Sequence, residues 1–476
     1  MGRRIFMLLL CSLFLVGWAT AQDSVKLSGT ISHPGADIIK ISYNDNYLAY
    51  YPKAFTAKVD KKGFFKMTFP VPKGHFVQAE INYGDKLAEL LLSSGDSLQM
   101  QVNTQHFDTS IHYSGRGADI QNFIALHTIT RGRMNQYTLK VKEAINNEPT
   151  DFLKTIAAEY KNETDFLTAK GSGLPPAFVN YWKAFYLYYN YFFMQQYPQM
   201  HEIVRLRRYT DTIPEQNYQV LHAMPLAFND SLLQLPPYLL YLTGVVEAKL
   251  KADGYTWIGK DTMKARKLED SAHTLAYTTL PAGSAAYYIA QGIYGKAKAQ
   301  QLSRTEYQYA KFKAHWPNSS YLPLLDKQVS LARKLAPGQP APDFTITTAE
   351  GKQMKLSDLK GKVVYLGFWA GWCRQCVGEM LNEKKMKDLL KKKPAAFVYV
   401  SLSNDTATEK TLIEHYKIEG IFTTEASGWE SKVAQAYGVQ NLPAYYLIDK
   451  EGNFAAQTAP TPMQILELVQ AIEKLF

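Results

Sequence analysis

Two cysteines, Cys373 and Cys376, are separated by two residues in the segment FWAGWCRQC, residues 368–376. Thiols at this spacing can work as a dithiol that exchanges disulfides, provide half of a metal site, or form a short structural disulfide. The choice depends on the compartment, on the other candidate ligands and on the elements that present the sulfurs.

The compartment is indicated by the N-terminal segment MGRRIFMLLLCSLFLVGWATAQ. Arg3 and Arg4 form a positive region, residues 5–16 are mostly apolar, and Ala19 to Ala21 are small residues of the kind that a signal peptidase needs. We therefore predict a signal peptide over residues 1–21 and export to the periplasm or cell envelope. A membrane anchor is disfavoured because the apolar run is shorter than the roughly 20 residues of a spanning helix. A lipoprotein would use Cys11, but Leu10 occupies the place of a small residue.

Cleavage after Ala21 would remove Cys11 and leave Cys373 and Cys376 as the only cysteines. It would also lower the formal net charge from +10 by two. In an exported protein we interpret the remaining positive charge as a solvated basic surface, and we expect no nucleic-acid partner. The sequence has no Walker-type loop, dinucleotide fingerprint or HExxH motif, so we expect no bound cofactor.

The element that presents the thiols is predicted by the residues on either side. The apolar segment KVVYLGF predicts a strand before the cysteines, and the residues from Cys373 to about Lys393 predict a helix. Cys373 would then lie at a helix N-terminus, where unpaired amides favour a thiolate, and Arg374 adds a positive charge. Cys376 would lie one turn further on, near enough to close a disulfide.

Three alternatives to a working dithiol remain in view. Zinc needs four ligands, but the mature chain has no second cysteine pair and no closely spaced histidine pair. A purely structural disulfide over so short a loop would remove little chain entropy. A peroxiredoxin would carry threonine at Ala370 and proline at Leu366. We therefore favour a dithiol, with the redox-active disulfide Cys373–Cys376 and no metal.

The chain of 476 residues is long enough for several domains, and 46% hydrophobic with 20% charged residues is typical of globular proteins. Short alternating segments predict an antiparallel β-sandwich over residues 22–117, and helical periodicity predicts an all-α region over 118–335. After LAPGQPAPDF the pattern predicts an α/β thioredoxin-like fold over 336–476. The aromatic stretch 180–197 predicts a buried or interface helix, although an apolar groove for a partner protein is an alternative.

Residues of about 337–476 resemble the exported TlpA/ResA-type thiol–disulfide oxidoreductases of the AhpC/TSA–redoxin group. The resemblance is carried by GQPAPDF, by LSDLKGKVVYLGFWAGWCRQC with Glu379, and by YGVQNLPAYYLIDKEG. The N-terminal region loosely resembles a β-domain of unknown function that often precedes exported thioredoxin-like domains.

The resemblance implies a role for each site residue. Cys373 would be the exposed nucleophile, and the more buried Cys376 would resolve the mixed disulfide. Pro443 would be a cis proline facing the site, and the backbone of Leu442 would pair with an extended substrate chain.

The resemblance also implies that Glu379 exchanges a proton with Cys376, since Gly367 stands where many thioredoxins have a buried aspartate. The alternative for Glu379 is an ordinary solvated glutamate. Trp372 would cover the sulfurs and contact substrates, whereas Trp369 would belong to the core. Leu381 replaces the proline that usually kinks this helix.

These features predict an exported thiol–disulfide oxidoreductase, with a reductase as the family expectation. Its partners would be protein disulfide substrates and a membrane thiol–disulfide electron donor. The alternative is an envelope ligand-binding or assembly protein in which the thioredoxin-like domain is a redox sensor or an anchor.

Overall fold

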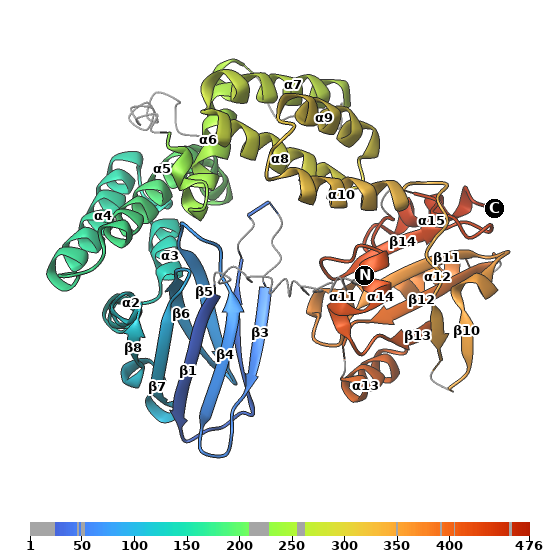
Figure 1. Ribbon diagram of the computed structural model, residues 1–476. Helices are drawn as coiled ribbons and strands as arrows, with labels where there is room; N and C mark the ends of the chain where they lie inside the picture. The colour runs from blue at the N-terminus through green and yellow to red at the C-terminus, as the bar shows by residue number, and fades with distance from the viewer. Residues whose placement is uncertain are drawn as a thin grey trace, which may run out of the picture. The chain divides into compact units, whose positions relative to one another are not determined.

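The computed structural model describes residues 24–44, 47–48, 53–208, 228–254, 262–348, 351–390, 393–403, 405–456 and 459–476 (Figure 1). The predicted signal peptide, residues 1–21, lies outside the described residues. The chain divides into two compact units, residues 1–288 and 289–476, and each is described by itself. The finer division at residues 117/118 and 335/336 stays a prediction.

The N-terminal unit begins with two four-stranded sheets of order β4-β1-β7-β8 and β3-β2-β5-β6. The strands are β1 (Ser24–Ser32), β2 (Ile38–Tyr43), β3 (Lys53–Lys58), β4 (Phe64–Pro70), β5 (Val77–Tyr83), β6 (Lys86–Leu92), β7 (Ser97–Asn103) and β8 (His112–Arg116), with two short helices, η1 (Thr104–His106) and α1 (Phe107–Ser110), between β7 and β8. Alternate residues of β1, β4 and β7 are buried, and one apolar cluster contains residues of both sheets.

One strand pairing differs from the predicted antiparallel arrangement. β1 pairs with β4 antiparallel but with β7 in parallel, in the register Leu27 to Leu98. The alternating burial pattern is the same for either direction, because the side-chain period of two does not depend on the neighbouring strand. The prediction of a wholly antiparallel region is therefore wrong at this pair.

The helical residues that follow span both units. The helices are α2 (Ala118–Arg131), α3 (Met134–Ala144), α4 (Pro149–Lys170), α5 (Pro176–Arg208), η3 (Asp230–Leu232), α6 (Pro236–Ala252), α7 (Thr262–Thr279), α8 (Ala282–Lys298), α9 (Leu302–His315) and α10 (Leu322–Lys334). The aromatic stretch 180–197 lies in α5, where Trp182, Tyr186 and Tyr197 are fully buried. The expectation of a buried helix is confirmed.

The C-terminal unit contains the predicted α/β arrangement around a sheet of order β13-β12-β11-β14. Its elements after α10 are β9 (Thr345–Thr347), β10 (Gln353–Lys355), η4 (Leu356–Leu359), β11 (Val363–Trp369), α11 (Arg374–Met380), α12 (Glu383–Leu390), β12 (Ala395–Ser401), α13 (Thr406–Tyr416), β13 (Ile421–Thr424), η5 (Gly428–Glu430), α14 (Lys432–Ala436), β14 (Ala444–Ile448) and α15 (Ile465–Glu473). β11 pairs in parallel with β12 and antiparallel with β14.

The central strand β11 is buried on both faces, which explains its unbroken apolar sequence. Val364, Leu366 and Phe368 pack into one cluster, whereas Val363 and Tyr365 pack into a second cluster with α15. The parallel strands β11, β12 and β13 end at the same edge of the sheet, where the loops that follow them meet. The cysteines lie at this edge.

The helix after the cysteines is shorter than predicted. α11 ends at Met380, and α12 starts at Glu383 after a turn at Leu381 and Asn382. The helix is therefore interrupted at Leu381 even though no proline is present there. Throughout the described part of the chain, no helix combines the length and the apolar character needed to cross a membrane.

Candidate functional site

The cysteines lie at the connection between the end of β11 and the start of α11. Cys373 and Cys376 form a disulfide with an S–S distance of 2.01 Å and a Cα–Cα distance of 5.2 Å. Cys373 is the N-cap residue of α11, and its Sγ accepts a hydrogen bond from the backbone N–H of Cys376 at 3.2 Å. An amide donor and a helix N-terminus at Sγ favour the thiolate when the pair is reduced.

The burial of the two cysteines only partly follows the expectation. Cys376 is fully buried, but Cys373, which was expected to be exposed, is only 7% exposed. In the disulfide form both sulfurs belong to one apolar cluster with Trp369, Met380 and Tyr399, which covers Cys373 as well. The prediction of an exposed Cys373 is therefore wrong for this form.

The two tryptophans beside the disulfide differ in the way the sequence indicated. Trp369 is buried at the end of β11, whereas the side chain of Trp372 is 63% exposed. An exposed tryptophan next to a disulfide offers a large apolar surface to another chain. Whether substrates contact Trp372 stays a prediction.

The loop before β14 lies at the same cluster. The Leu442–Pro443 peptide bond is cis, in agreement with the expectation, and both residues are half-buried. Leu442 packs against the cluster that contains Cys373 and Cys376. The structure therefore brings Leu442 against the cysteine cluster and places the cis peptide bond to Pro443 directly after it, as a substrate-binding role would require.

Glu379 lies one turn beyond Cys376 and is 3% exposed, so the alternative of a solvated glutamate is wrong. Its Oε1 accepts a hydrogen bond from Gln375 Nε2 at 3.0 Å, and its Oε2 has no partner among the described residues. Neither oxygen is hydrogen-bonded to a sulfur within that part of the chain. Proton exchange between Glu379 and Cys376 stays a prediction.

A side chain in place of Gly367 on the strand would meet tight packing. A Cβ atom there would lie 3.1 Å from Tyr445 Cε1 and 3.2 Å from Tyr399 Cδ1. The two tyrosine rings would have to move by a few tenths of an ångström to admit a side chain at 367.

A second buried carboxyl group, Glu409 on α13, was missed by the sequence analysis. It is 4% exposed, and its Oε1 accepts hydrogen bonds from the Gly371 N–H at 3.2 Å and from the Ser401 hydroxyl. Burial raises the pKa of Glu409, and the hydrogen bonds from Ser401, Gly371 and Ser403 only partly offset this effect. Nothing in the sequence distinguishes it from Glu414 on the same helix, because its partners lie outside the helix, on β12 and on the loops after β11 and β12.

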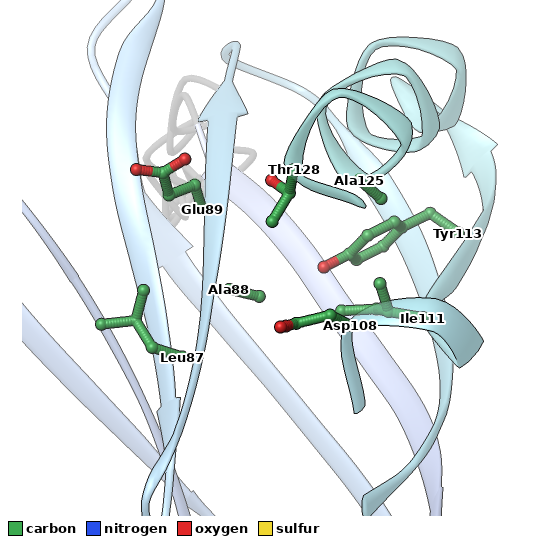
Figure 2. A pocket seen from close by; sticks show the side chains of 8 residues that line it. All are labelled: Leu87, Ala88, Glu89, Asp108, Ile111, Tyr113, Ala125 and Thr128. Atoms are coloured by element: carbon green, nitrogen blue, oxygen red, sulfur yellow. The ribbon is translucent and has the colours of Figure 1, made fainter. Parts of the chain in front are cut away.

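The other described regions of the chain offer no metal site, but they contain a small pocket. No group of three or more His, Cys, Asp or Glu side chains that could hold a metal ion is found among the described residues. Figure 2 shows a small pocket in the N-terminal unit, lined by residues of β6, β8 and α2 among others. Glu89 and Tyr113 line it, and burial raises the pKa of both. Its lining presents carboxyl and hydroxyl groups and contains no cysteine.

Comparison with known proteins gives matches to the C-terminal unit. A family model described as Redoxin matches residues 336–463. The thiol-disulfide oxidoreductase ResA of Bacillus anthracis is 34% identical over 124 residues, which are 26% of this chain and 70% of that protein. ResA of Bacillus subtilis is 30% identical over 118 residues, 25% of this chain and 64% of its own.

Solved structures give matches of similar extent. The thioredoxin domain of a thiol-disulfide oxidoreductase from Bacteroides vulgatus is 27% identical, with 29% of this chain and 97% of that chain covered and a TM-score of 0.27. A thiol:disulfide interchange protein DsbE from Chlorobium tepidum is 31% identical, with 30% and 98% covered and a TM-score of 0.27.

Proposed function

The chain belongs to the TlpA/ResA-type thiol–disulfide oxidoreductases through its C-terminal redoxin domain, and we propose that it is exported and uses Cys373 and Cys376 to exchange disulfides with protein substrates. The observation that supports the proposal most directly is the Cys373–Cys376 disulfide at the start of α11, against which Leu442 packs beside cis Pro443. A fixed dithiol next to a proline loop suits the binding of an extended polypeptide.

The proposed reaction starts from the reduced pair. The Cys373 thiolate attacks one sulfur of a substrate disulfide, forms a mixed disulfide and releases the other substrate sulfur as a thiolate. The thiolate of Cys376 then attacks the Cys373 sulfur and releases the second substrate thiolate. Two electrons pass from the dithiol to the substrate, and the Cys373–Cys376 disulfide is formed.

The reductase direction needs a donor that returns two electrons to this disulfide. We propose a membrane thiol–disulfide donor for that step, because an exported protein lies outside the reducing pools of the cytosol. Protein substrates would contact the exposed ring of Trp372 and pair with the backbone of Leu442. Glu379 would give or take the proton of Cys376, which lies one turn away.

The proposal is tested by reduction of insulin disulfides in the presence of dithiothreitol. The parent protein is expected to accelerate insulin reduction, and a Cys373→Ser, Cys376→Ser double variant is expected to give the uncatalysed rate, because both sulfurs that carry the electrons are gone. Equal rates for the two proteins would overturn the proposal and would favour the ligand-binding or assembly alternative.

A pair of single variants separates the roles of the two cysteines. Cys376→Ala is expected to accumulate mixed disulfides with envelope proteins that dithiothreitol releases, because no second thiol resolves them. The matched Cys373→Ala variant is expected to trap none. Equal trapping by both variants would show that the assigned order of attack is wrong.

A further inference from the structure

The turn that presents Cys373 is held from outside the cysteine helix. The backbone N–H of Cys373 donates to the carbonyl oxygen of Ala370 at 3.0 Å, which closes a four-residue turn between β11 and α11. Within this turn the N–H of Gly371 points outward and donates to Oε1 of Glu409 at 3.2 Å. The turn is therefore tied to α13 by one buried carboxyl group.

Glycine at position 371 suits the close approach of α13. A Cβ atom at this position would lie 3.0 Å from Cγ of Glu409 and 3.7 Å from side-chain atoms of Thr408 and Leu412. The absence of a side chain at 371 lets the carboxyl group reach the backbone of the turn. The contact between the turn and α13 therefore depends on both residues, on the small size of Gly371 and on the carboxyl group of Glu409.

The other partners of Glu409 tie the turn to the sheet. The hydroxyl of Ser401, the last residue of β12, donates to the same carboxyl oxygen, and the Ser403 hydroxyl also bonds to the carboxyl group. Gly371 follows β11, Ser401 ends β12 and Ser403 follows β12 at the same edge of the sheet, and the Glu409 side chain joins them.

The partners of Glu409 are neutral donors. Among the described residues, the one charged group that acts on Glu409 is Asp405, the N-cap residue of the same helix, which raises the pKa of Glu409 further. When it is ionised, the Glu409 carboxylate places a buried negative charge on the N–H of Gly371, which precedes Cys373 by two residues in the same turn. Like charges disfavour each other, so this carboxylate opposes ionisation of the Cys373 thiol.

We propose that Glu409 is a positioning residue for disulfide exchange, which fixes the Ala370–Cys373 turn against β12 and α13 and moderates the acidity of the Cys373 thiol. The inference rests on the proposed function, but Glu409 does not touch the substrate in it. It acts through the backbone N–H of Gly371 and through its charge.

The test compares the reduced parent protein with Glu409→Gln, Glu409→Ala and, as a matched control on the same helix, Glu414→Gln, whose side chain is 67% exposed. The rate of alkylation of Cys373 by iodoacetamide is measured against pH by peptide mass mapping, and insulin reduction is measured in parallel. Alkylation reports the thiolate and requires no protein substrate.

Glu409→Gln keeps an acceptor at Oε1 but removes the charge. We expect its alkylation midpoint to fall by about 0.5 pH units or more, which is roughly a three-fold change in thiolate fraction below the midpoint. Glu409→Ala removes the acceptor as well, and we expect a loss of about ten-fold in insulin reduction, since the turn is no longer anchored. Glu414→Gln is expected to match the parent in both measurements.

The inference is overturned if a folded Glu409→Gln protein keeps the parent midpoint. That variant alone decides the question if Glu409→Ala fails to fold, because glutamine preserves the hydrogen bonds from Gly371 and Ser401. A parent that alkylates normally but does not reduce insulin would contradict the proposed function and leave the alkylation test of Glu409 in force.

Discussion

Glu163 in the helical region of the N-terminal unit and Glu409 beside the disulfide are both buried carboxyl groups, but their surroundings differ. Glu163, on α4, lies between two basic side chains of α2: His127 Nε2 is 2.9 Å from Oε2, and Arg131 Nε donates to Oε1 at 2.8 Å. Glu409 is surrounded by hydroxyl and amide donors.

The difference changes the charge state that each site favours. Burial alone would raise the pKa of Glu163, but the hydrogen bonds and charges of His127 and Arg131 outweigh burial and hold the pKa below its ordinary value. At Glu409 burial prevails, and the pKa is raised. The ionised Glu163 carboxylate links α2 to α4, whereas the Glu409 carboxyl group is more easily protonated than an ordinary glutamate. Glu163 thus stabilises the fold, whereas Glu409 is proposed to adjust the acidity of the Cys373 thiol.

The largest effect is expected from breaking the paired site. Glu163→Ala would leave buried His127 and half-buried Arg131 without the Glu163 carboxylate, and breaking a buried ion pair in this way costs about 3–5 kcal/mol. Native-state hydrogen exchange of α2 and α4 measures the loss, while insulin reduction is expected to stay within about two-fold of the parent. The control is Glu159→Ala on the same helix, one turn earlier.

Glu159 contacts Arg131 at 3.6 Å from a more exposed position, so its removal is expected to cost no more than about 1 kcal/mol. Equal losses for the two variants would show that Glu163 is not the group that fastens α2 to α4.

The next largest effect is an opposite pH dependence of stability. A lowered pKa means that the folded state holds Glu163 ionised, so its stabilisation is present above the ordinary value of 4.5 and is lost as the pH falls through the folded-state pKa. A raised pKa means the reverse for Glu409: stability falls as the pH rises from 4.5 through the folded-state pKa. Each unit of displacement corresponds to about 1.4 kcal/mol.

Glutamine variants isolate the contribution of each carboxyl group to the change of stability with pH. Thermal unfolding at a series of pH values measures it. Relative to the parent, Glu163→Gln is expected to lose more stability as the pH rises, and Glu409→Gln is expected to gain over the same direction of change. Glu414→Gln should give a flat difference. Parallel slopes for Glu163→Gln and Glu409→Gln would remove the contrast between the two regions.

The smallest effect is expected at the exposed ring of Trp372. Trp372→Ala removes apolar surface that substrates would cover, so KM for insulin is expected to rise about five-fold, equivalent to roughly 1 kcal/mol, with kcat and thermal stability unchanged. Leu466→Ala, which truncates an even more exposed apolar residue on α15, is the control and should leave KM unchanged. A loss of stability without a change in KM would mean that Trp372 is a packing residue.

The sequence predicted the parts of the site that depend on neighbouring residues. The unbroken apolar segment before Cys373 predicted the buried strand β11, and the cysteine spacing predicted sulfurs within bonding reach at a helix start. The α/β order of the C-terminal unit and the buried aromatic helix α5 followed from the same local periodicity.

Features that depend on distant segments were not predictable in this way. Glu409 acquires its role from Gly371 and Ser401, which lie on other elements, so no local spacing marks it. The parallel pairing of β1 with β7 depends on the route of the chain, and the cover over Cys373 depends on residues such as Tyr399 of β12. The interruption of the helix at Leu381 has no signal such as proline.

The place of β1 in its sheet has a consequence for truncated forms of the protein. β1 lies between β4 and β7, so it is an interior strand although it is the first described element of the chain. Loss of this strand by proteolysis would open two unpaired edges at once, and such edges invite pairing between molecules. Because β7 follows much later in the chain, the sheet also closes only after the segment through Asn103 is available. Strand β1 therefore protects the edges of β4 and β7 from pairing with other molecules. A chain that has lost β1 by proteolysis is expected to self-associate.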